Sequence, residues 1–315
     1  MTNIEYFKNF NMGYELQNAG EFIFESANKM FGLRALYDYF TINLILYNGA
    51  VGIERLQKIL WCMYNISDLD ELDKEENEQL TKHNHIELQR QIVDQNIMSK
   101  LEKCENSLIE VFANYYNKYR YSEYRLEPEK PKINSLLIDY LNIYSDEHYE
   151  EDKPITKLQK DKFKKLYINI IGELAKKYHV KIKDKAYELG LYTYEINSTS
   201  NAYIVYNSIG TLYDEFVMNT RSIKELILYL IKSEDRGSLK KLSAEISPLD
   251  IDPSSIKYYL YDLISYRQIL ELKDVVYESY NDFNKDELLT RKGIIDLIGN
   301  PDCLIEELDE CEKEE

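Results

Sequence analysis

The stretch NKYRYSEYR, residues 117–125, gathers side chains that suit the recognition of phosphates and bases. Arg120 and Arg125 stay charged at physiological pH, and their planar guanidinium groups match the spacing of phosphate oxygens. Tyr121 and Tyr124 stand beside them and can stack on nucleobases. The stretch therefore predicts an RNA-binding site, with the arginines on phosphate and the tyrosines on bases.

The four histidines are the candidates for moving a proton near neutral pH. His83 and His85 lie two residues apart at the start of a helix expected from about residue 84, a spacing that does not bring both rings to one helical face. Capping and surface roles compete with catalysis for this pair. His148 and His179 stand alone, so we assign them no catalytic role.

Other chemistries lack their usual motifs. The four cysteines show no CxxC spacing, so we expect free thiols and neither a zinc site nor a disulfide framework. The sequence has no GxxxxGK[ST], GxGxxG, HExxH or GxSxG motif. The acidic segment 67–79 lacks the glycine and the fixed spacing of a calcium loop, which favours a solvated loop. We expect no metal and no cofactor.

The net charge of −17 opposes binding of a polyanion to the chain as a whole. Residues 153–185 are the exception, with 11 basic and 3 acidic side chains. Lys160 and Lys164 lie on this expected basic helix and are further candidates for phosphate contacts. Pairing of the basic helix with the acidic N-terminal half explains the lysines equally well.

Only 11 glycines and 6 prolines occur in 315 residues, which favours a mainly helical fold. Residues 33–64 predict a long helix that is apolar almost all round, typical of the centre of a bundle. One row on it combines Phe40, Leu44, Tyr47 and Val51; a second combines Ile42, Ile45, Ile53, Leu56, Leu60 and Met63. Asparagines and glycines interrupt the apolar run, so we expect no membrane span. Since the first residues do not resemble a secretory signal, we expect a cytoplasmic protein.

Glu54, Arg55 and Lys58 follow the apolar centre of this helix. Glu54 and Lys58 are four residues apart and predict a structural ion pair. The alternative is that Arg55 or Lys58 points towards the same cleft as Arg120 and builds a small anion site.

Three segments together resemble the four-helix HEPN domain of bacterial proteins: LYNGAVGIERLQKIL at 46–60, KHNHIELQRQI at 82–92 and NYYNKYRYSEY at 114–124. The resemblance spans about residues 20–126. It implies a helical bundle that commonly dimerises and, in many members, a metal-independent ribonuclease whose site is shared by two subunits.

The active members of the family carry an arginine and, four to six residues later, a histidine. Arg120 matches the arginine, but Arg125 occupies the position five residues on. Arginine does not act as a base near neutral pH, so the stretch favours holding an anion over moving a proton. If the protein is a ribonuclease, Arg120 would stabilise the charge that develops during cleavage. The general base would then come from another segment, such as His83 or His85 of a partner subunit.

Residues 221–298 resemble a winged helix. SLKKLSAEI and SSIKYYLYDLISYRQILEL match its second and third helices, VVYES a wing strand, and LLTRKGIIDLI its closing strand and helix. Residues 221–293 hold 12 basic and 13 acidic side chains, which gives weak attraction for DNA and leaves protein contacts as an alternative role. YTYEINSTSNAYIVY at 192–206 predicts a β-hairpin.

We therefore expect a mainly α protein with a small α+β part. The expected divisions are an HEPN-like bundle at 1–130, a region with an acidic linker, basic helix and hairpin at 131–220, a winged-helix-like domain at 221–300 and an acidic tail at 301–315. The expected function is binding of RNA or of a protein partner in a toxin, antiphage or regulatory role, by a homodimer. The alternatives are a DNA-binding regulator and a metal-independent ribonuclease with a degenerate motif.

Overall fold

The computed structural model describes residues 1–69, 74–124, 132–150, 155–232, 246–264 and 270–298, and these residues form helices and no strand. The elements are α1 (Asn3–Tyr6), η1 (Phe7–Asn11), α2 (Met12–Phe31), α3 (Tyr39–Asn65), α4 (Lys74–Thr81), α5 (His85–Asp94), α6 (Lys103–Asn114), η2 (Tyr115–Tyr119), η3 (Ser122–Tyr124), α7 (Ile133–Tyr144), α8 (Lys157–Glu188), α9 (Asn201–Asn207), α10 (Leu212–Lys232), α12 (Ile256–Ile264), α13 (Leu270–Asn281) and α14 (Lys285–Leu297). η1 and η2 are π-helical turns, and η3 is a 3₁₀ turn.

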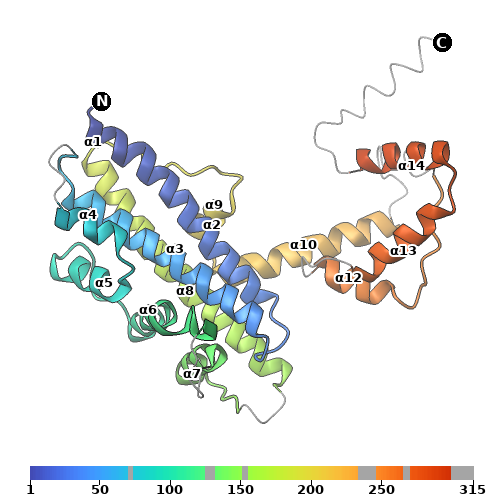
Figure 1. Ribbon diagram of the computed structural model, residues 1–315, viewed down its shortest axis with the longest axis horizontal. Helices are drawn as coiled ribbons and strands as arrows, with labels where there is room; N and C mark the ends of the chain where they lie inside the picture. Colours follow the sequence, from blue (N-terminus) through green and yellow to red (C-terminus); the bar gives the residue numbers. More distant parts are fainter. Residues whose placement is uncertain (70–73, 125–131, 151–154, 233–245, 265–269, 299–315) are drawn as a thin grey trace. The chain divides into compact units, whose positions relative to one another are not determined.

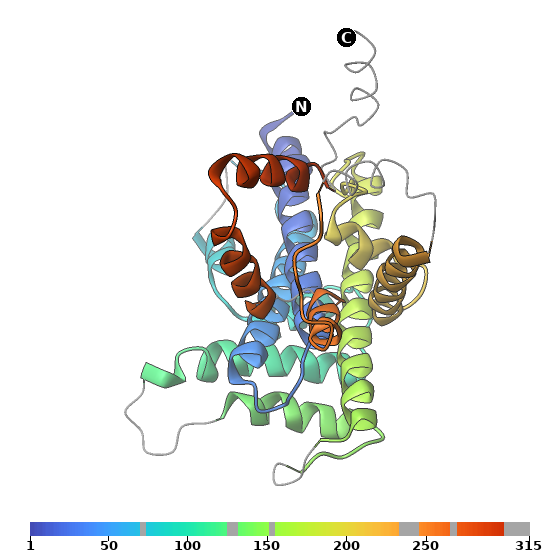
Figure 2. The same cartoon turned by 90° about the vertical axis from the view of Figure 1, so that its right-hand side faces the viewer.

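The chain divides into two compact units, Met1–Val217 and Met218–Glu315. In the first unit, α3 is the central helix: α2, α5, α6, α7 and α8 all pack against it. α2, α3 and α8 run side by side in Figure 1. α6 and α7 lie across the lower half of α8 in Figure 2. Since α7 and α8 share the core of α2 and α3, the unit of the N-terminal helices does not end near residue 130 and extends to Val217.

Small residues let the long helices approach closely. A Cβ added at Gly52 would lie 2.5 Å from Cγ1 of Ile23 and 3.0 Å from the backbone oxygen of Ala19. A Cβ at Gly20 would lie 2.5 Å from Cβ of Ala202. Side chains at these positions would therefore force α2 away from α3 and from α9.

The two apolar rows of α3 differ in burial. All six residues of the second row are buried: Ile42, Ile45, Ile53, Leu56, Leu60 and Met63. In the first row Phe40 is 79% exposed and Leu44 is 43% exposed, whereas Val51 is buried. No helix covers the outer end of that row within the first unit's described residues.

Among the residues that the structure describes, no helix has both the length and the apolar character that crossing a bilayer requires.

The predicted β-hairpin at 192–206 is wrong, because residues 201–207 form helix α9. Ser200 caps this helix, and its hydroxyl accepts a hydrogen bond from the backbone N–H of Tyr203 at 3.2 Å. Ala202, Val205 and Tyr206 are buried at helical spacing. A short run of β-branched and aromatic residues suits a buried helix as well as a strand, and the cap decides for the helix.

The prediction of a small α+β winged-helix domain is also wrong. The segment VVYES, expected as a wing strand, lies inside α13, and LLTRKGIIDLI, expected to contain the closing strand, lies within and just after α14. In α13 the partly buried residues recur at helical spacing, at 272, 275, 276, 279 and 280. Asn284 caps α14 with a capping box. Most of SLKKLSAEI lies outside the described residues.

Candidate anion site

A cavity of about 390 Å³ opens beside the middle of α3. Its walls come from α2, α3, α4, the loop before α5, and η2 with the residue that follows it: Glu15, Phe22, Tyr47, Val51, Glu54, Arg55, Lys58, Leu80, His83, Tyr116 and Arg120. The three segments that carry the HEPN-like pattern each contribute to this wall.

A π-helical turn places Arg120 at the cavity. α6 widens into η2, where the backbone N–H of Arg120 donates to the carbonyl of Tyr115 at 2.8 Å, five residues back. The hydroxyl of Tyr115 donates to Oδ1 of Asn43 at 2.8 Å, which ties the turn to α3. π-Turns inside helices recur at functional sites, because the extra residue reorients the side chains that follow.

The guanidinium of Arg120 is held by aromatic rings. Its carbon lies 4.8 Å from the ring centroid of Tyr116, 4.9 Å from that of Tyr121 and 5.4 Å from that of Tyr47. Burial raises the pKa of Tyr116 to about 12, so this ring is neutral. Among the side chains that the structure describes, no carboxylate pairs with Arg120. The rings fix the plane of the guanidinium and leave its N–H groups available for an anion.

Glu54 organises the opposite wall. Its carboxylate is 5% exposed and accepts from Nζ of Lys58 at 2.5 Å. Nδ1 of His83 lies 3.0 Å from both of its oxygens. Burial alone would raise the pKa of Glu54, but the hydrogen bonds from Lys58 and His83 outweigh burial and lower it. Glu54 is therefore a carboxylate at neutral pH and positions both of its partners.

His83 is the exposed histidine of the cavity. Its side chain is 55% exposed, and its ring stacks on Tyr116 with centroids 5.1 Å apart. A proton on Nδ1 serves the bond to Glu54, an assignment that follows from the acceptor. Nε2 is then the basic nitrogen of the ring, and no hydrogen bond to it is formed by the described residues.

Arg55 completes the set of cations. It pairs with Glu15 of α2, and its guanidinium lies 5.3 Å from the ring centroid of Phe22. Arg55, Lys58 and Arg120 face Glu15 and Glu54, so three positive charges meet two negative ones. The cavity carries one positive charge in excess within a chain whose net charge is −17, and a second when His83 is protonated.

The remaining predicted site residues lie in different surroundings. Tyr121 is 59% exposed and Tyr124 is 86% exposed, with ring centroids 6.3 Å apart in the segment that follows η2. One face of Tyr121 lies against the guanidinium of Arg120, and the remaining surface of both rings is largely exposed to solvent. Arg125 lies outside the described residues.

His85 lies in the core and not at the cavity. It has no exposed surface, and its Nε2 donates to the carbonyl of Ala50 at 3.0 Å. Burial lowers its pKa, and Nδ1 has no hydrogen-bond partner. This neutral, enclosed ring does not reach a substrate in the cavity, so of the two predicted histidines only His83 is placed beside Arg120.

Lys160 and Lys164 lie on α8 and do not line the cavity. Nζ of Lys164 donates to the carbonyl of Phe31 at 2.7 Å, and Nζ of Lys160 donates to that of Arg34 at 3.1 Å. Both lysines thereby satisfy carbonyls at the end of α2 and in the loop that follows. This arrangement gives them a role in joining α8 to α2.

Sequence reasoning missed Glu15, Phe22, Tyr47 and Tyr116 as cavity residues. Tyr47 was placed on an apolar row of α3, but the sequence does not show that the outer end of this row is uncovered. Tyr116 follows an ordinary helical pattern, and only the π-turn brings it under Arg120 and His83. Glu15 depends on the contact between α2 and α3, which no local spacing reveals.

Across the described residues, no group of three or more His, Cys, Asp or Glu side chains is arranged to hold a metal ion. Comparisons with protein-family models, with curated proteins and with solved structures give no match to this chain.

Proposed function

We propose that the protein binds RNA, with one backbone phosphate held in the cavity by Arg120. The observation that carries this proposal is the guanidinium of Arg120, which is ringed by tyrosines and has no carboxylate partner among the described side chains. An oriented guanidinium binds phosphate through two parallel, charge-assisted hydrogen bonds. Tyr121 and Tyr124, both exposed, supply faces for the neighbouring bases.

The resemblance to HEPN domains supports RNA as the nucleic acid. The three segments that carry it belong to α3, to α5 with the loop before it, and to α6 with η2, and all three meet at the cavity. The acidic character of the chain supports a small, local site over a long basic track, because the net charge repels the rest of a polyanion.

Binding is measured by fluorescence anisotropy of a labelled single-stranded RNA at low salt. Arg120→Ala should weaken binding about tenfold, the loss expected for a charge-assisted contact of about 1.4 kcal/mol. Arg120→Lys should restore only part of the affinity, because lysine lacks the fork of donors. Arg221→Ala removes an exposed arginine of α10 that lies outside the cavity and should bind as the parent does. The proposal fails if the parent does not bind RNA or if Arg120→Ala binds equally well.

Metal-independent RNA cleavage is a second candidate, which the bond between His83 and Glu54 favours. In this reaction Nε2 of His83 would take the proton of a ribose 2′-hydroxyl, and the 2′-oxygen would attack the adjacent phosphorus. The bond from phosphorus to the 5′-oxygen breaks, the 5′-oxygen takes a proton from water, and a 2′,3′-cyclic phosphate forms. Arg120 would stabilise the charge on the phosphate oxygens, and Glu54 would hold the ring of His83 in place.

Cleavage is tested with labelled RNA in the presence of EDTA. His83→Ala should slow cleavage by a factor of about 100 or more, as expected for loss of a general base. Its matched control, His148→Ala, changes an exposed histidine outside the cavity and should cleave at the parent rate. Absence of cyclic-phosphate products from the parent would remove this candidate and leave the binding proposal intact.

A second copy of the chain is the proposed protein partner. Phe40 and Leu44 are large apolar side chains exposed on α3, on the same row as Tyr47 at the cavity. Pairing of two copies through this row would cover apolar surface and would bring two cavities close to one interface.

A further inference from the structure

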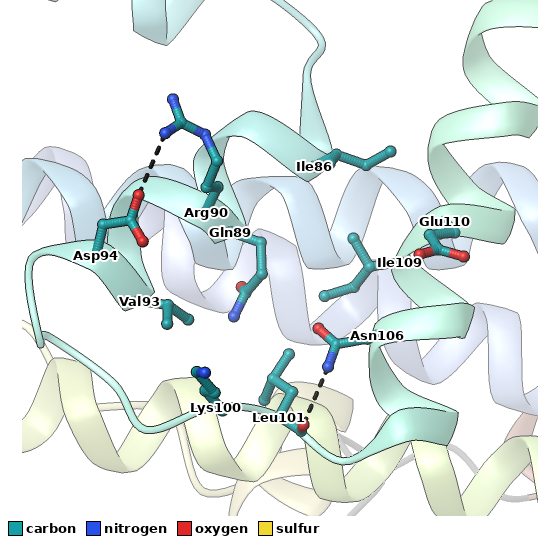
Figure 3. Close-up of a pocket in the computed structure, with 10 residues that line it drawn as sticks. All are labelled: Ile86, Gln89, Arg90, Val93, Asp94, Lys100, Leu101, Asn106, Ile109 and Glu110. Atoms are coloured by element: carbon teal, nitrogen blue, oxygen red, sulfur yellow. Dashed lines mark hydrogen bonds and ion pairs between the residues drawn. The ribbon is translucent and has the colours of Figure 1, made fainter.

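A second hollow of about 390 Å³ lies between α5, α6 and the segment that joins them (Figure 3). It shares no lining residue with the cavity around Arg120. Ile86, Val93, Leu101 and Ile109 form the apolar part of its walls, and the polar part is formed by Gln89, Arg90, Asp94, Lys100, Asn106 and Glu110. Figure 3 shows Ile109 of α6 and Gln89 of α5 pointing into the same space. The hollow therefore has an apolar body and at least one polar group directed into it.

Gln89 presents a buried donor to this hollow. Its side chain is 6% exposed, and its Oε1 accepts from the hydroxyl of Tyr178 and from Nε2 of Gln57 at 3.4 Å. The hydroxyl of Tyr178 itself accepts from Nε2 of Gln57 at 3.2 Å, so its proton is directed to Gln89. If the amide oxygen and nitrogen of Gln89 were exchanged, its N–H groups would face the N–H groups of Gln57. The hydrogen bonds therefore fix the orientation of the Gln89 amide.

Nε2 of Gln89 is left without a hydrogen-bond partner. A buried amide N–H that finds no acceptor is costly, so a ligand that brings an acceptor to this point gains more than an ordinary hydrogen bond. The acceptor side chains that line the hollow, Asp94, Asn106 and Glu110, form no hydrogen bond with this amide nitrogen.

Lys100 supplies a positive charge at the same hollow. It is exposed, and no ion pair to it is formed by the described acidic residues. The other cation, Arg90, is engaged by Glu87 at 2.6 Å and by Asp94 at 3.2 Å. Asn106 uses its amide N–H on the carbonyl of Leu101 at 3.0 Å. Nε2 of Gln89 and Nζ of Lys100 are thus two donors at the hollow that no described side chain engages.

We propose that this hollow binds a small aliphatic carboxylate. The carboxylate accepts from Lys100 and from Gln89, and the aliphatic chain covers Ile86, Val93 and Ile109. Glu110 lies across the hollow from Lys100 in Figure 3, which favours placing the negative head at the Lys100 end. An ion pair combined with apolar burial is the usual recognition of such ligands, with few polar groups fixing the orientation.

Three probes share a six-carbon aliphatic chain and differ in the head group: hexanoate, 1-hexanol and hexylamine. Comparing them separates the contribution of the head group to binding from that of the aliphatic chain. Each is titrated into the full-length protein and followed by ligand-observed NMR. Hexanoate should bind about tenfold more tightly than 1-hexanol, since only hexanoate forms the charge-assisted contact, and hexylamine should bind the most weakly. Equal binding of hexanoate and 1-hexanol, or no saturable binding of hexanoate, would overturn the proposal.

Variants locate the site. Lys100→Gln should remove the preference for hexanoate over 1-hexanol, whereas Lys103→Gln, an exposed lysine that does not line the hollow, should keep it. Gln89→Met keeps the length of the side chain and should weaken hexanoate with little effect on 1-hexanol, in protein whose circular dichroism matches the parent. Equal hexanoate affinity in the parent and in Lys100→Gln would also overturn the proposal. Because the hollow is separate from the cavity, these outcomes are independent of RNA binding.

Discussion

Nδ1 of His83 lies 3.0 Å from both carboxylate oxygens of Glu54, a bond that joins the loop before α5 to the middle of α3. The same carboxylate holds Lys58, one turn further along α3. A buried carboxylate thus positions the two groups that face Arg120 across the cavity. The geometry of the site depends on Glu54 keeping its charge.

Glu54→Gln should destabilise the protein in a pH-dependent manner. The folded state lowers the pKa of Glu54, so its stabilising contribution is complete above the unfolded pKa of about 4.3 and is lost as pH falls through the folded value. The variant should lose about 1–3 kcal/mol of unfolding free energy at neutral pH and less in acid. Urea unfolding at neutral pH and near pH 3 measures both differences.

Glu25→Gln is the matched control, because Glu25 forms a surface pair with Lys29 at 3.9 Å on α2. It should change the unfolding free energy by less than about 0.5 kcal/mol at either pH. A loss in Glu54→Gln as small as that in Glu25→Gln would show that the carboxylate does not organise the site.

His179 should make the fold sensitive to acid. Its ring is buried and stacks on Tyr206 with centroids 4.5 Å apart, and burial, aided by the charge of Lys183, lowers its pKa to about 4. As pH falls from about 6.5 to about 4, His179 becomes protonated in the unfolded chain but stays neutral in the folded chain. The free energy of unfolding therefore decreases by up to about 1.4 kcal/mol per pH unit.

His179→Phe retains a flat ring on Tyr206 and should remove this part of the acid sensitivity. Above about pH 7 the ring of His179 is neutral in both states, so the difference between parent and variant should be constant there. Urea unfolding across the range gives the slope of unfolding free energy against pH. Identical slopes for the two proteins between pH 6.5 and pH 4 would contradict the burial of a neutral His179.

Gly52→Ala should destabilise the first unit by about 1–3 kcal/mol, because the added methyl would overlap Ile23 and push α2 away from α3. Gly13→Ala is the control in α2, where the nearest atom, the carbonyl oxygen of Thr193, would lie 3.7 Å from the new Cβ. This change should be neutral or stabilising by up to about 1 kcal/mol through helix propensity. Chemical unfolding of both variants makes the comparison, and a neutral Gly52→Ala would refute the close approach.

The double variant Phe40→Glu with Leu44→Glu should separate the proposed dimer into single chains. Charges on this row of α3 would face each other across the interface and repel. Size-exclusion chromatography with light scattering should give the mass of two chains for the parent and of one chain for the variant. Ile143→Glu, at an exposed position of α7, should leave the parent mass unchanged. A parent of single-chain mass would rule the interface out.

The predominance of helix follows from the sequence, because few glycines and prolines interrupt long periodic stretches. The face of α3 that enters the core does not follow from it. Both rows are apolar, and only the tertiary contacts of α2, α5, α6, α7 and α8 decide that Ile42 is buried and Phe40 exposed. The strands were mispredicted for a related reason, since short β-branched runs fit a helix once a cap such as Ser200 begins one.

The candidate site was predictable in its residue types but not in its assembly. Arg120 stood out through its aromatic neighbours, and Arg55 and Lys58 through their charge on an apolar helix. The choice between His83 and His85 rests on where α5 begins: Asn84 caps the helix, which turns His85 inward and leaves His83 on the loop beside Glu54. The π-turn that delivers Arg120 has no signature in the sequence.

The central claim is that Arg120 holds an RNA phosphate, and the salt dependence of binding tests it most directly. Anisotropy titrations of a labelled single-stranded RNA at several salt concentrations give the slope of log affinity against log salt for the parent, Arg120→Ala and Arg221→Ala. Loss of one phosphate contact should weaken binding and make the slope of Arg120→Ala shallower by about 0.7, with Arg221→Ala unchanged. Equal affinities and equal slopes for the parent and Arg120→Ala would contradict the claim.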